Sequence, residues 1–551
     1  MAGHALMQTI VDAFLFHAAR TPDRVAWRTM DGATVSWAQW AVLSQQVAAA
    51  LAASGVRPGD RVAVLAGNSL AWPIADMGAL LAGAVSVGLY PTASSEQVAE
   101  VLRDCGARVV IVDDATQLAK VQKVRGQLDA LEVLVGWGSV GAPATPWNAW
   151  LSAARATASV HRAPEDDAVL IYTSGSTGIP KGARISHRCL VETARSISEV
   201  LSLTSADTSL SYLPFCHAAE RMFGYATRVW LGMEAMLVED GARVFDAAAA
   251  YHPTLFGGLP RFFEKAHEKF EAASLLPGTD AERAQRMREV RASLFGKRLR
   301  VATSGGAPLS ELVGKALDAR GVRVLGAYGQ TEHLCVAMHR PDRVNFTTVG
   351  LPMPGTELRI ADDGEVLVKR GPLTFSGYFG RDDETREAFT ADGAWLKTGD
   401  LGNVDAEGFL RITGRKKEIL VLSTGKKVAP LPIEAALCAG PWIEHAMLYG
   451  DGRSFITALF TVRDAPLRLL ADREGLPWSG NDLLKHDAVR REVQARVAQV
   501  NADLSRHEQV KKWVLVPDTF TVTGGELTPT MKLKRHEVTA HYAPLLDQLY
   551  E

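Results

Sequence analysis

The chain has 551 residues, more than one hydrophobic core usually organises, so we expect two or more domains. Apolar residues make up 47% and charged residues 22% of the sequence, a balance that excludes a fibrous or disordered chain. Lysine plus arginine (60) nearly equals aspartate plus glutamate (62), and the net charge of -2 excludes a general attraction to nucleic acid.

The cysteines and the N-terminal segment indicate the compartment. Five cysteines are scattered without a CxxC pair, which argues against a disulfide framework and a zinc site and favours a reducing cytoplasm. The first 24 residues lack a basic leader and predict an amphipathic helix, not a signal peptide. The uncharged stretch 77–95 is interrupted by glycines and Pro91, so it predicts a buried helix and strand, and no transmembrane segment is expected.

Helical and strand patterns alternate in the first half of the chain. Ser36 suits a helix N-cap, and apolar side chains follow at helical spacing until Gly55. Residues 60–67 predict a buried strand, and further β-rich runs occur near Val110 and Leu170. This alternation predicts an α/β fold with parallel sheets.

The pattern changes between residues 350 and 413 to short strand-like pieces, where Asp363 and Gly364 predict a hairpin turn in a small β-barrel or antiparallel sheet. After the charged segment 414–419 the helical and strand patterns restart, so we expect a hinge there and a mobile α+β domain beyond it. The predicted organisation is a large N-terminal domain at 1–414, a hinge at 415–417 and a small C-terminal domain at 418–551.

The segment YTSGSTGIPKG (172–182) follows the strand predicted near Leu170 and is rich in glycine and hydroxyl side chains. Glycines let backbone N–H groups converge on an anion, hydroxyls add donors, and Lys181 adds a compact positive charge. Pro180 before the lysine and Gly182 after it exclude a Walker loop, which requires Ser or Thr after the lysine. The segment therefore predicts a phosphate-binding loop, with a flexible surface loop as the alternative.

This loop resembles the phosphate loop of the AMP-forming adenylating superfamily, which contains acyl-CoA synthetases, luciferases and peptide-synthetase adenylation domains. Other segments resemble the superfamily's motifs in order and spacing: SYLPFCHAAER (211–221), TSGGAPL (303–309), GAYGQTE (326–332), LKTGD (396–400), GRKKEI (414–419) and LTPTMKLKR (527–535). Together they span nearly the whole chain. The resemblance implies an enzyme that joins a carboxylate to the α-phosphate of ATP and releases pyrophosphate.

The resemblance also implies roles for single residues. Glu332 and Thr177 would hold Mg²⁺, which prefers hard oxygen ligands together with substrate phosphates. Tyr328 would stack on adenine, with core packing as its alternative, and Asp400 would accept both ribose hydroxyls. The other residues implied to bind ATP or AMP are Thr173, Ser174, Gly175, Ser176, Gly178, Lys181, Gly305, Gly306, Ala307, Gly329, Thr331 and Arg415.

His217 lies where the superfamily often has an aromatic or histidine side chain beside the acyl carboxylate. The sequence leaves open whether His217 is catalytic or only gates the acyl site. Glu220 and Arg221 are expected to form a local ion pair or to be solvated. The apolar residues of this segment supply either a wall for the acid or ordinary core packing: Phe215, Met222, Phe223 and Tyr225.

In the C-terminal domain, Lys532 resembles the lysine that bridges the attacking carboxylate and the α-phosphate during adenylation. The neighbouring Lys534 and Arg535 are expected to stay solvated or to bind phosphate elsewhere. Lys417 resembles the hinge residue about which the small domain rotates between the two half-reactions.

Coenzyme A is the acyl acceptor that the resemblance favours. Residues 329–371 run without a long insertion, whereas superfamily members that avoid coenzyme A usually carry an added block near the end of the large domain. The segment STGKKVAP (423–430) resembles the loop that lines the pantetheine tunnel, so Ser423, Gly425 and Lys426 are expected to bind coenzyme A. Solvated surface charge is the alternative for the lysine.

The segments 211–221 and 255–269 resemble those of bacterial long-chain fatty acyl-CoA synthetases. We therefore expect activation of a fatty acid with ATP, Mg²⁺ and coenzyme A, and the acyl chain length stays open. The alternatives are a CoA ligase for an aryl or other bulky acid and a non-catalytic nucleotide-binding paralogue. We expect a cytoplasmic monomer or homodimer that binds no nucleic acid, and peripheral membrane contact stays open.

Overall fold

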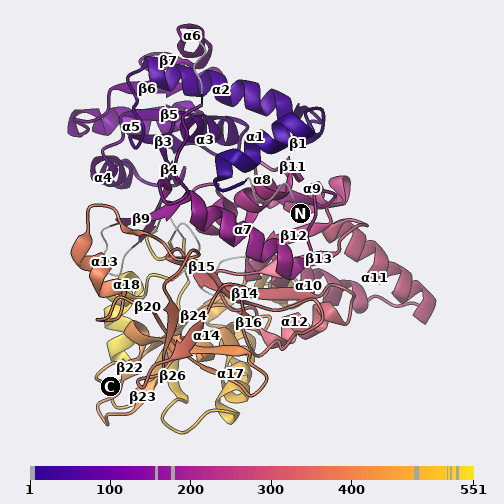
Figure 1. Cartoon of the computed structure of the whole chain (residues 1–551). Helices are drawn as coiled ribbons and strands as arrows, with labels where there is room; N and C mark the ends of the chain where they lie inside the picture. The colour runs from indigo at the N-terminus through magenta and orange to yellow at the C-terminus, as the bar shows by residue number, and fades with distance from the viewer. Residues whose placement is uncertain are drawn as a thin grey trace. The chain divides into compact units, whose positions relative to one another are not determined.

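The computed structural model of the protein describes residues 7–154, 159–174, 180–476, 483–517, 519–521, 524–528 and 533–551, with the backbone alone for Ser174. The chain divides into two compact units, whose helices and strands are labelled in Figure 1. The first contains Met1–Leu309, Gly314–Leu358 and Leu367–Lys397, and the second contains Ser310–Val313, Arg359–Val366 and Thr398–Glu551. This division does not identify where the chain bends, so the hinge at 415–417 stays a prediction.

One largely parallel sheet of the first unit has the strand order β19-β9-β8-β4-β3-β5-β6-β7. Its strands are β3 (Arg61–Leu65), β4 (Val85–Leu89), β5 (Val109–Val112), β6 (Val133–Gly136), β7 (Thr145–Pro146), β8 (Asp167–Ser174), β9 (Pro180–Ser186) and β19 (Gly377–Tyr378). Strands β9 and β19 run antiparallel to their neighbours, and the others are parallel. The strands predicted at 60–67 and near Val110 and Leu170 are therefore confirmed.

Both faces of this sheet are covered by helices. Val62, Ala63 and Val64 are consecutive on β3 and all fully buried, which requires apolar cover on each side. Helices α4 (Ser95–Cys105) and α5 (Ala115–Val124) pack on the Ala63 side, while α3 (Ala71–Leu81) contacts β3 and β4 and packs on α2 (Trp37–Ala53). Helix α2 begins at the predicted N-cap, Ser36. The Ser36 hydroxyl accepts from the Gln39 N–H, and the Gln39 side-chain oxygen accepts from the Ser36 N–H.

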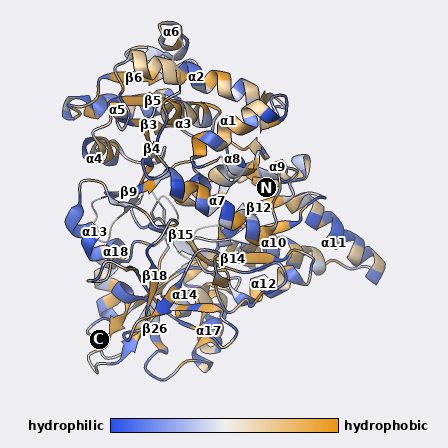
Figure 2. Cartoon of the chain, viewed as in Figure 1, coloured by the Kyte–Doolittle hydropathy of each residue, from blue (hydrophilic) through white to orange (hydrophobic). Residues whose placement is uncertain are grey.

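A further sheet of this unit has the order β16-β15-β14-β13-β12-β10-β11-β1-β2, with parallel strands from β14 to β1. Its strands are β1 (Val25–Thr29), β2 (Thr34–Ser36), β10 (Thr208–Ser211), β11 (Glu234–Leu237), β12 (Leu255–Gly258), β13 (Val301–Ser304), β14 (Val324–Gln330), β15 (His333–Met338) and β16 (Leu351–Pro352). The remaining helices of the unit include α1 (Ile10–Arg20), α6 (Trp147–Ser152), α7 (His187–Leu201), α8 (Thr227–Leu231), α9 (Val244–Tyr251), α10 (Pro260–Ser274), α11 (Asp280–Phe295) and α13 (Asp382–Ala388). The strands of both sheets are predominantly apolar (Figure 2), as buried parallel strands require.

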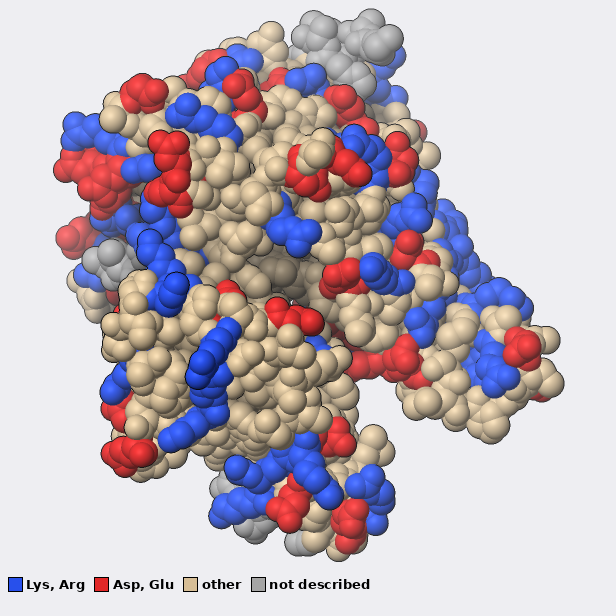
Figure 3. All heavy atoms as spheres, turned by 90° about the horizontal axis from the view of Figure 1, so that it is seen from below, with Lys and Arg blue, Asp and Glu red and all other residues tan. Residues whose placement is uncertain are grey.

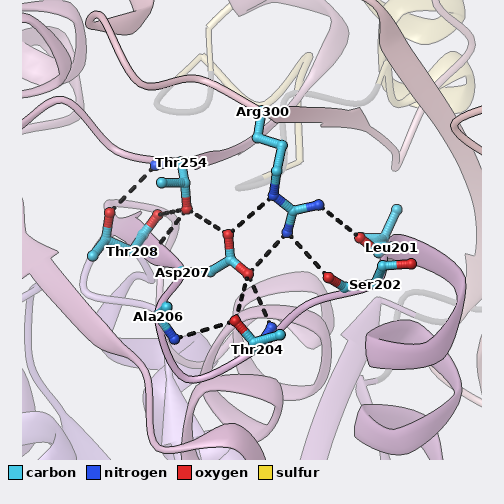
Figure 4. A network of polar contacts seen from close by, with 8 residues as sticks. All are labelled: Leu201, Ser202, Thr204, Ala206, Asp207, Thr208, Thr254 and Arg300. Atoms are coloured by element: carbon cyan, nitrogen blue, oxygen red, sulfur yellow. Dashed lines mark hydrogen bonds and ion pairs between the residues drawn. The ribbon is translucent and has the colours of Figure 1, made fainter.

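A polar network ties together the amino ends of β10, β12 and β13 (Figure 4). The Arg300 guanidinium binds both oxygens of the buried Asp207 carboxylate, at 3.2 and 2.8 Å. It also donates to the carbonyls of Leu201, the last residue of α7, and of Ser202, the C-cap. Thr254 Oγ1 donates to the same carboxylate at 2.8 Å. Burial alone would raise the pKa of Asp207, but the bonds from Thr204, Thr254 and Arg300 together lower it. The network links the amino ends of three parallel strands and so helps to fix their register, at the end of the sheet opposite to the carboxyl ends of these strands.

An antiparallel half-barrel of order β17-β18-β20-β21 follows. Its strands are β17 (Leu358–Ile360), β18 (Glu365–Lys369), β20 (Trp395–Val404) and β21 (Leu410–Arg415). The hairpin predicted at Asp363 and Gly364 joins β17 to β18, and Gly364 has a φ of 87°, which favours glycine. The parallel α/β subdomains and the small antiparallel β subdomain expected from the sequence pattern are therefore present.

The second unit contains a sheet of order β24-β25-β26 with helices on both faces. Its elements are β22 (Leu420–Val421), β23 (Lys427–Val428), α14 (Pro430–Cys438), β24 (Ile443–Tyr449), β25 (Ile456–Val462), α15 (Asp464–Glu474), α17 (Asp487–Ala502), β26 (Val510–Leu515) and α18 (Arg535–Gln548). Helices α14 and α17 pack on the Phe460 side of β25, and α18 packs on the Leu459 side. This is the small α+β domain that the sequence predicts.

Acidic and basic side chains are interspersed over the face of the chain seen in Figure 3, in keeping with the near-zero net charge. Among the described helices, none is both long enough and apolar enough to cross a membrane.

Candidate active site

The predicted phosphate loop connects β8 to β9. Thr173 and Lys181 face each other in the antiparallel register at the two ends of this connection. Gly182 packs against the Tyr172 ring, and a Cβ at this position would lie 2.9 Å from the ring. The central residues of the predicted loop, Gly175, Ser176, Thr177 and Gly178, lie outside the described residues.

Lys181 and Glu332 meet around a third side chain, Tyr378. The Tyr378 hydroxyl donates to Glu332 Oε1 at 2.6 Å, and Lys181 Nζ lies 5.5 Å from the centroid of the Tyr378 ring. Lys181 comes from β9, Glu332 from the turn between β14 and β15, and Tyr378 from β19. Three separate parts of the first unit therefore bring a cation, a phenol and a carboxylate together.

Backbone hydrogen bonds hold these parts in place. The Phe375 N–H donates to the Glu332 carbonyl at 2.9 Å, and the Phe379 N–H donates to the Gly182 carbonyl at 2.8 Å. Between these bonds, Tyr378 pairs with Ala183 as β19 joins the edge of β9. The segment that carries Tyr378 thus spans from the phosphate loop to Glu332.

The residues predicted to hold the nucleotide base follow neighbouring strands. Gly305, Gly306 and Ala307 come directly after β13, and Tyr328 lies on the parallel neighbour β14. Gly306 and Ala307 are exposed and Tyr328 is only half-buried, so Tyr328 is not a core side chain. Its stacking on adenine stays a prediction, as do the roles of the residues that follow it, Gly329 and Thr331.

Glycine at 329 is required by packing. A Cβ on Gly329 would lie 1.6 Å from the carbonyl oxygen of Leu334, because β15 folds back closely on β14. This close approach brings the chain back directly after Glu332 and fixes the turn that presents its carboxylate.

Asp400 and Arg415 belong to the second unit and pair across β20 and β21. Arg415 Nε donates to Asp400 Oδ1 at 3.0 Å, and the Asp400 side chain is buried while that of Arg415 is 45% exposed. The adjacent Lys416 binds Asp363 and Glu365 at 2.5 and 2.8 Å. The structure thus brings Asp400 and Arg415 together in an ion pair. The Asp400 carboxylate is the group that is predicted to accept the ribose hydroxyls.

His217 precedes a π-helical segment, Ala219–Ala226, and is half-buried. The Ala219 N–H donates to His217 Nδ1 at 3.2 Å, so this ring nitrogen serves as a local cap. That contact supports a structural role for the His217 ring. Whether His217 is catalytic or gates the acyl site stays a prediction.

The expectation that Glu220 and Arg221 form a local ion pair is wrong. Arg221 pairs with Asp76 of α3, and Glu220 pairs with Arg228 of α8 at 2.6 Å. All four side chains are nearly fully buried. Adjacent residues of a helix project in different directions, so each finds its partner on another element.

The apolar residues of the same segment lie in an aromatic core. Phe215 stacks on Trp72 with centroids 5.2 Å apart, and Tyr225 packs on Trp27. Phe215, Met222 and Tyr225 are at most 2% exposed, so they act as core residues in this structure. Phe223 is half-buried.

The residues predicted to bind coenzyme A lie on an exposed hairpin between β22 and β23. The Gly425 N–H donates to the Leu422 carbonyl at 2.8 Å, and Gly425 has a φ of 78°, as a tight turn requires. Ser423 and Lys426 are exposed on the same turn. Lys417, the predicted hinge residue, lies exposed in the short 3₁₀ turn Lys416–Glu418.

Lys532 lies outside the described residues, but its neighbours are placed. Leu527 and Leu533 form an antiparallel bridge, so they bracket the segment that contains Lys532. The expectation that Arg535 is solvated or binds phosphate is wrong, since its guanidinium donates to both carboxylate oxygens of Glu434 at 2.8 and 2.9 Å. Glu434, a buried acid on α14, binds this cation more strongly than water would.

Glu332 can serve the predicted magnesium site. Oε1 accepts from Tyr378, and among the described residues no side chain donates to Oε2, which leaves a hard anionic oxygen for a cation. Sequence reasoning missed Tyr378, because it is 46 residues from Glu332 and lies outside every motif. The aromatic residues on either side of it, Phe375 and Phe379, were the one local signal.

Two family models together match most of the chain. A sequence model described as AMP-binding enzyme matches residues 14–379, and one described as AMP-binding enzyme C-terminal domain matches residues 417–551. The chain belongs to the AMP-binding enzymes, the adenylating superfamily that its motifs resemble.

Individual relatives cover nearly all of the chain. The long-chain-fatty-acid–CoA ligase FadD15 of Mycobacterium bovis is 36% identical, with 98% of this chain and 97% of that protein covered. The long-chain-fatty-acid–CoA ligase ACSBG2 of Gallus gallus is 30% identical, with 89% and 74% covered. The crystal structure of the anthranilate CoA ligase AuaEII in complex with anthranoyl-AMP has a TM-score of 0.81 at 23% identity, covers 98% of both chains, and so shares the fold.

Proposed function

We propose that this protein activates a long-chain fatty acid with ATP, forming acyl-AMP and pyrophosphate, and then transfers the acyl group to coenzyme A. The observation that carries the proposal is the meeting of Lys181 and Glu332 around Tyr378, directly beside the predicted phosphate loop. The names of the relatives that are 36% and 30% identical support a long-chain acid.

A carboxylate is a poor electrophile and repels the phosphates of ATP. Adenylation therefore needs the two held together while negative charge is neutralised as pyrophosphate leaves. Lys181 provides a fixed positive charge for the phosphates, and Lys532 is the proposed cation between the attacking carboxylate and the α-phosphate. Glu332 together with Thr177 would hold Mg²⁺, which supplies further charge neutralisation on the phosphate oxygens.

In the proposal, other residues bind the ribose and the base of ATP. Asp400 accepts the ribose hydroxyls with help from Arg415, and Tyr328 stacks on adenine above the small residues 305–307. In the second half-reaction the thiol of coenzyme A attacks the acyl-AMP carbonyl and AMP leaves. The exposed hairpin with Ser423, Gly425 and Lys426 contacts the coenzyme.

A panel of carboxylic acids tests the proposal. Saturated acids from C2 to C18, benzoate, anthranilate and a bile acid are each incubated with ATP, Mg²⁺ and coenzyme A, and pyrophosphate, AMP and thioester are measured. We expect the highest kcat/KM with C12 to C18 acids and stoichiometric release of pyrophosphate and AMP. Preference for an aryl or bulky acid would replace the fatty acid, and release of ADP or phosphate would contradict adenylation itself. Absence of turnover with every acid would favour a non-catalytic paralogue.

A further inference from the structure

Tyr378 lies between two residues of the proposed ATP site and belongs to none of the motifs. Its hydroxyl is 2.6 Å from Glu332 Oε1, and Lys181 Nζ is 5.5 Å from its ring centroid. A single side chain therefore touches both the carboxylate proposed for the metal and the lysine proposed for the phosphates.

The position of Tyr378 is fixed from several sides. Its N–H donates to Thr385 Oγ1 at 2.8 Å, and its backbone pairs with Ala183 on β9. Its ring packs edge-on against Phe375, with centroids 4.9 Å apart. A phenol held in this way cannot turn its hydroxyl away from Glu332 without breaking the packing around it.

In this bond the phenol O–H donates and the Glu332 carboxylate accepts.

Among the residues that the structure describes, Tyr378 is the one whose side chain donates a hydrogen bond to the Glu332 carboxylate. A hydrogen bond to one oxygen restricts rotation of a carboxylate and leaves the other oxygen to a cation. Hydrogen-bonded partners of metal ligands orient those ligands in this way, and their loss typically lowers metal affinity by about 10- to 100-fold.

We propose that Tyr378 is a positioning residue, whose hydroxyl orients Glu332 for the divalent cation of the bound nucleotide while its ring face steadies the Lys181 ammonium. The inference rests on the proposed function, because it takes Glu332 as the metal-binding carboxylate. It adds a residue that acts through Glu332 and does not itself touch the metal.

The test is binding of Mn²⁺ together with α,β-methylene-ATP, with free Mn²⁺ measured by electron paramagnetic resonance. Tyr378→Phe removes one oxygen and keeps the ring. We expect its Kd for Mn²⁺ to rise about tenfold, in line with the loss of a ligand-orienting hydrogen bond, while the metal-free affinity for the analogue stays within twofold. Tyr550→Phe deletes a phenol that donates to two backbone carbonyls of the second unit, so it should leave Mn²⁺ binding unchanged. A Kd for Tyr378→Phe within twofold of the parent would overturn the proposal.

A double-mutant cycle separates positioning from general damage. If Tyr378 acts through Glu332, adding Tyr378→Phe to Glu332→Gln should weaken Mn²⁺ binding no further, whereas additive losses would refute the coupling. Should Tyr378→Phe fail to fold by circular dichroism, Tyr378→Leu, which also lacks a donor, takes its place in the same cycle with the same expected outcome. These measurements need neither acid nor coenzyme A. Unchanged Mn²⁺ binding in an enzyme that passes the acid panel removes only the role of Tyr378, and failure of the panel alone removes only the proposed function.

Discussion

Arg535 at the start of α18 donates to both carboxylate oxygens of Glu434 on α14, at 2.8 and 2.9 Å. The same guanidinium donates to the Leu448 carbonyl at 2.8 Å, so one side chain joins α18 to α14 and to β24. Burial raises the pKa of Glu434, while the Arg535 charge and the Leu448 amide oppose that rise. The carboxylate is thus costly to bury without its cation, and the pair holds the start of α18 against α14.

Arg535→Ala should destabilise the second unit by about 3 kcal/mol, because it leaves a buried carboxylate without its partner. Hydrogen exchange measured by mass spectrometry should show lost protection in α14, β24 and α18. Arg473→Ala is the control, since its pair with Glu474 is exposed and should contribute less than about 0.5 kcal/mol. Equal protection in the two variants would contradict the importance of the buried pair.

Gly329→Ala should prevent the close return of β15, because its Cβ would fall 1.6 Å from the Leu334 carbonyl oxygen. We expect a loss of more than about 3 kcal/mol in unfolding free energy, or insoluble protein, as for severe overpacking against backbone. Gly371→Ala, where nothing lies within 4 Å, should stay within about 0.5 kcal/mol in urea unfolding. A Gly329→Ala protein as stable as the parent would show that this turn can open.

Burial of His187 should make the free energy of unfolding fall as the pH is lowered. Burial first, and then the Arg162 charge, lower the pKa of His187 to about 4, although Asp166 and Asp12 oppose this. The unfolded chain takes up a proton near pH 6.5 and the folded chain does not. Unfolding free energy should therefore drop by about 1.4 kcal/mol per pH unit from pH 6.5 to about 4 and then level off.

Urea unfolding of the parent and His187→Gln between pH 7.5 and 4.5 measures this contribution. The variant should lose the part of the slope that His187 supplies, whatever other groups titrate. Parallel slopes for both proteins would mean that His187 takes up its proton at the same pH in the folded and unfolded chains.

Lys417→Pro tests the proposed hinge. Proline fixes φ, so it should restrict rotation of the small domain between the half-reactions. We expect acyl-AMP formation to persist and thioester formation to slow by about tenfold or more, measured by rapid quench with supplied acyl-AMP. A thioester step as fast as in the parent enzyme would place the hinge elsewhere.

Lys532→Ala should separate the half-reactions in the opposite sense. Adenylation should fall by roughly 10² or more, as for loss of one electrostatic contact in a transition state, while supplied acyl-AMP still reacts with coenzyme A. Lys534→Ala is the matched control, two residues away in the same basic run. Equal effects of the two substitutions, or equal loss in both steps, would remove Lys532 from the adenylation site.

Local chemistry explains what could be predicted from the sequence. The N-cap at Ser36, the buried strand at 60–67 and the turn at Gly364 depend on residues within a few positions of one another. The motifs, by their order and spacing, identified the superfamily, and the alternation of helical and strand patterns predicted the α/β and α+β classes of the two parts. Such features need no knowledge of distant partners.

Only the tertiary structure decided which charged and polar side chains meet. Arg221 pairs with Asp76, 145 residues away, and not with its neighbour Glu220, and Arg535 pairs with Glu434, 101 residues away. Tyr378 reaches Glu332 because β19 joins the edge of β9, which no local pattern specifies. Partner choice follows from how separate elements pack, and a buried ion or phenol binds whichever opposite group that packing places within hydrogen-bond distance.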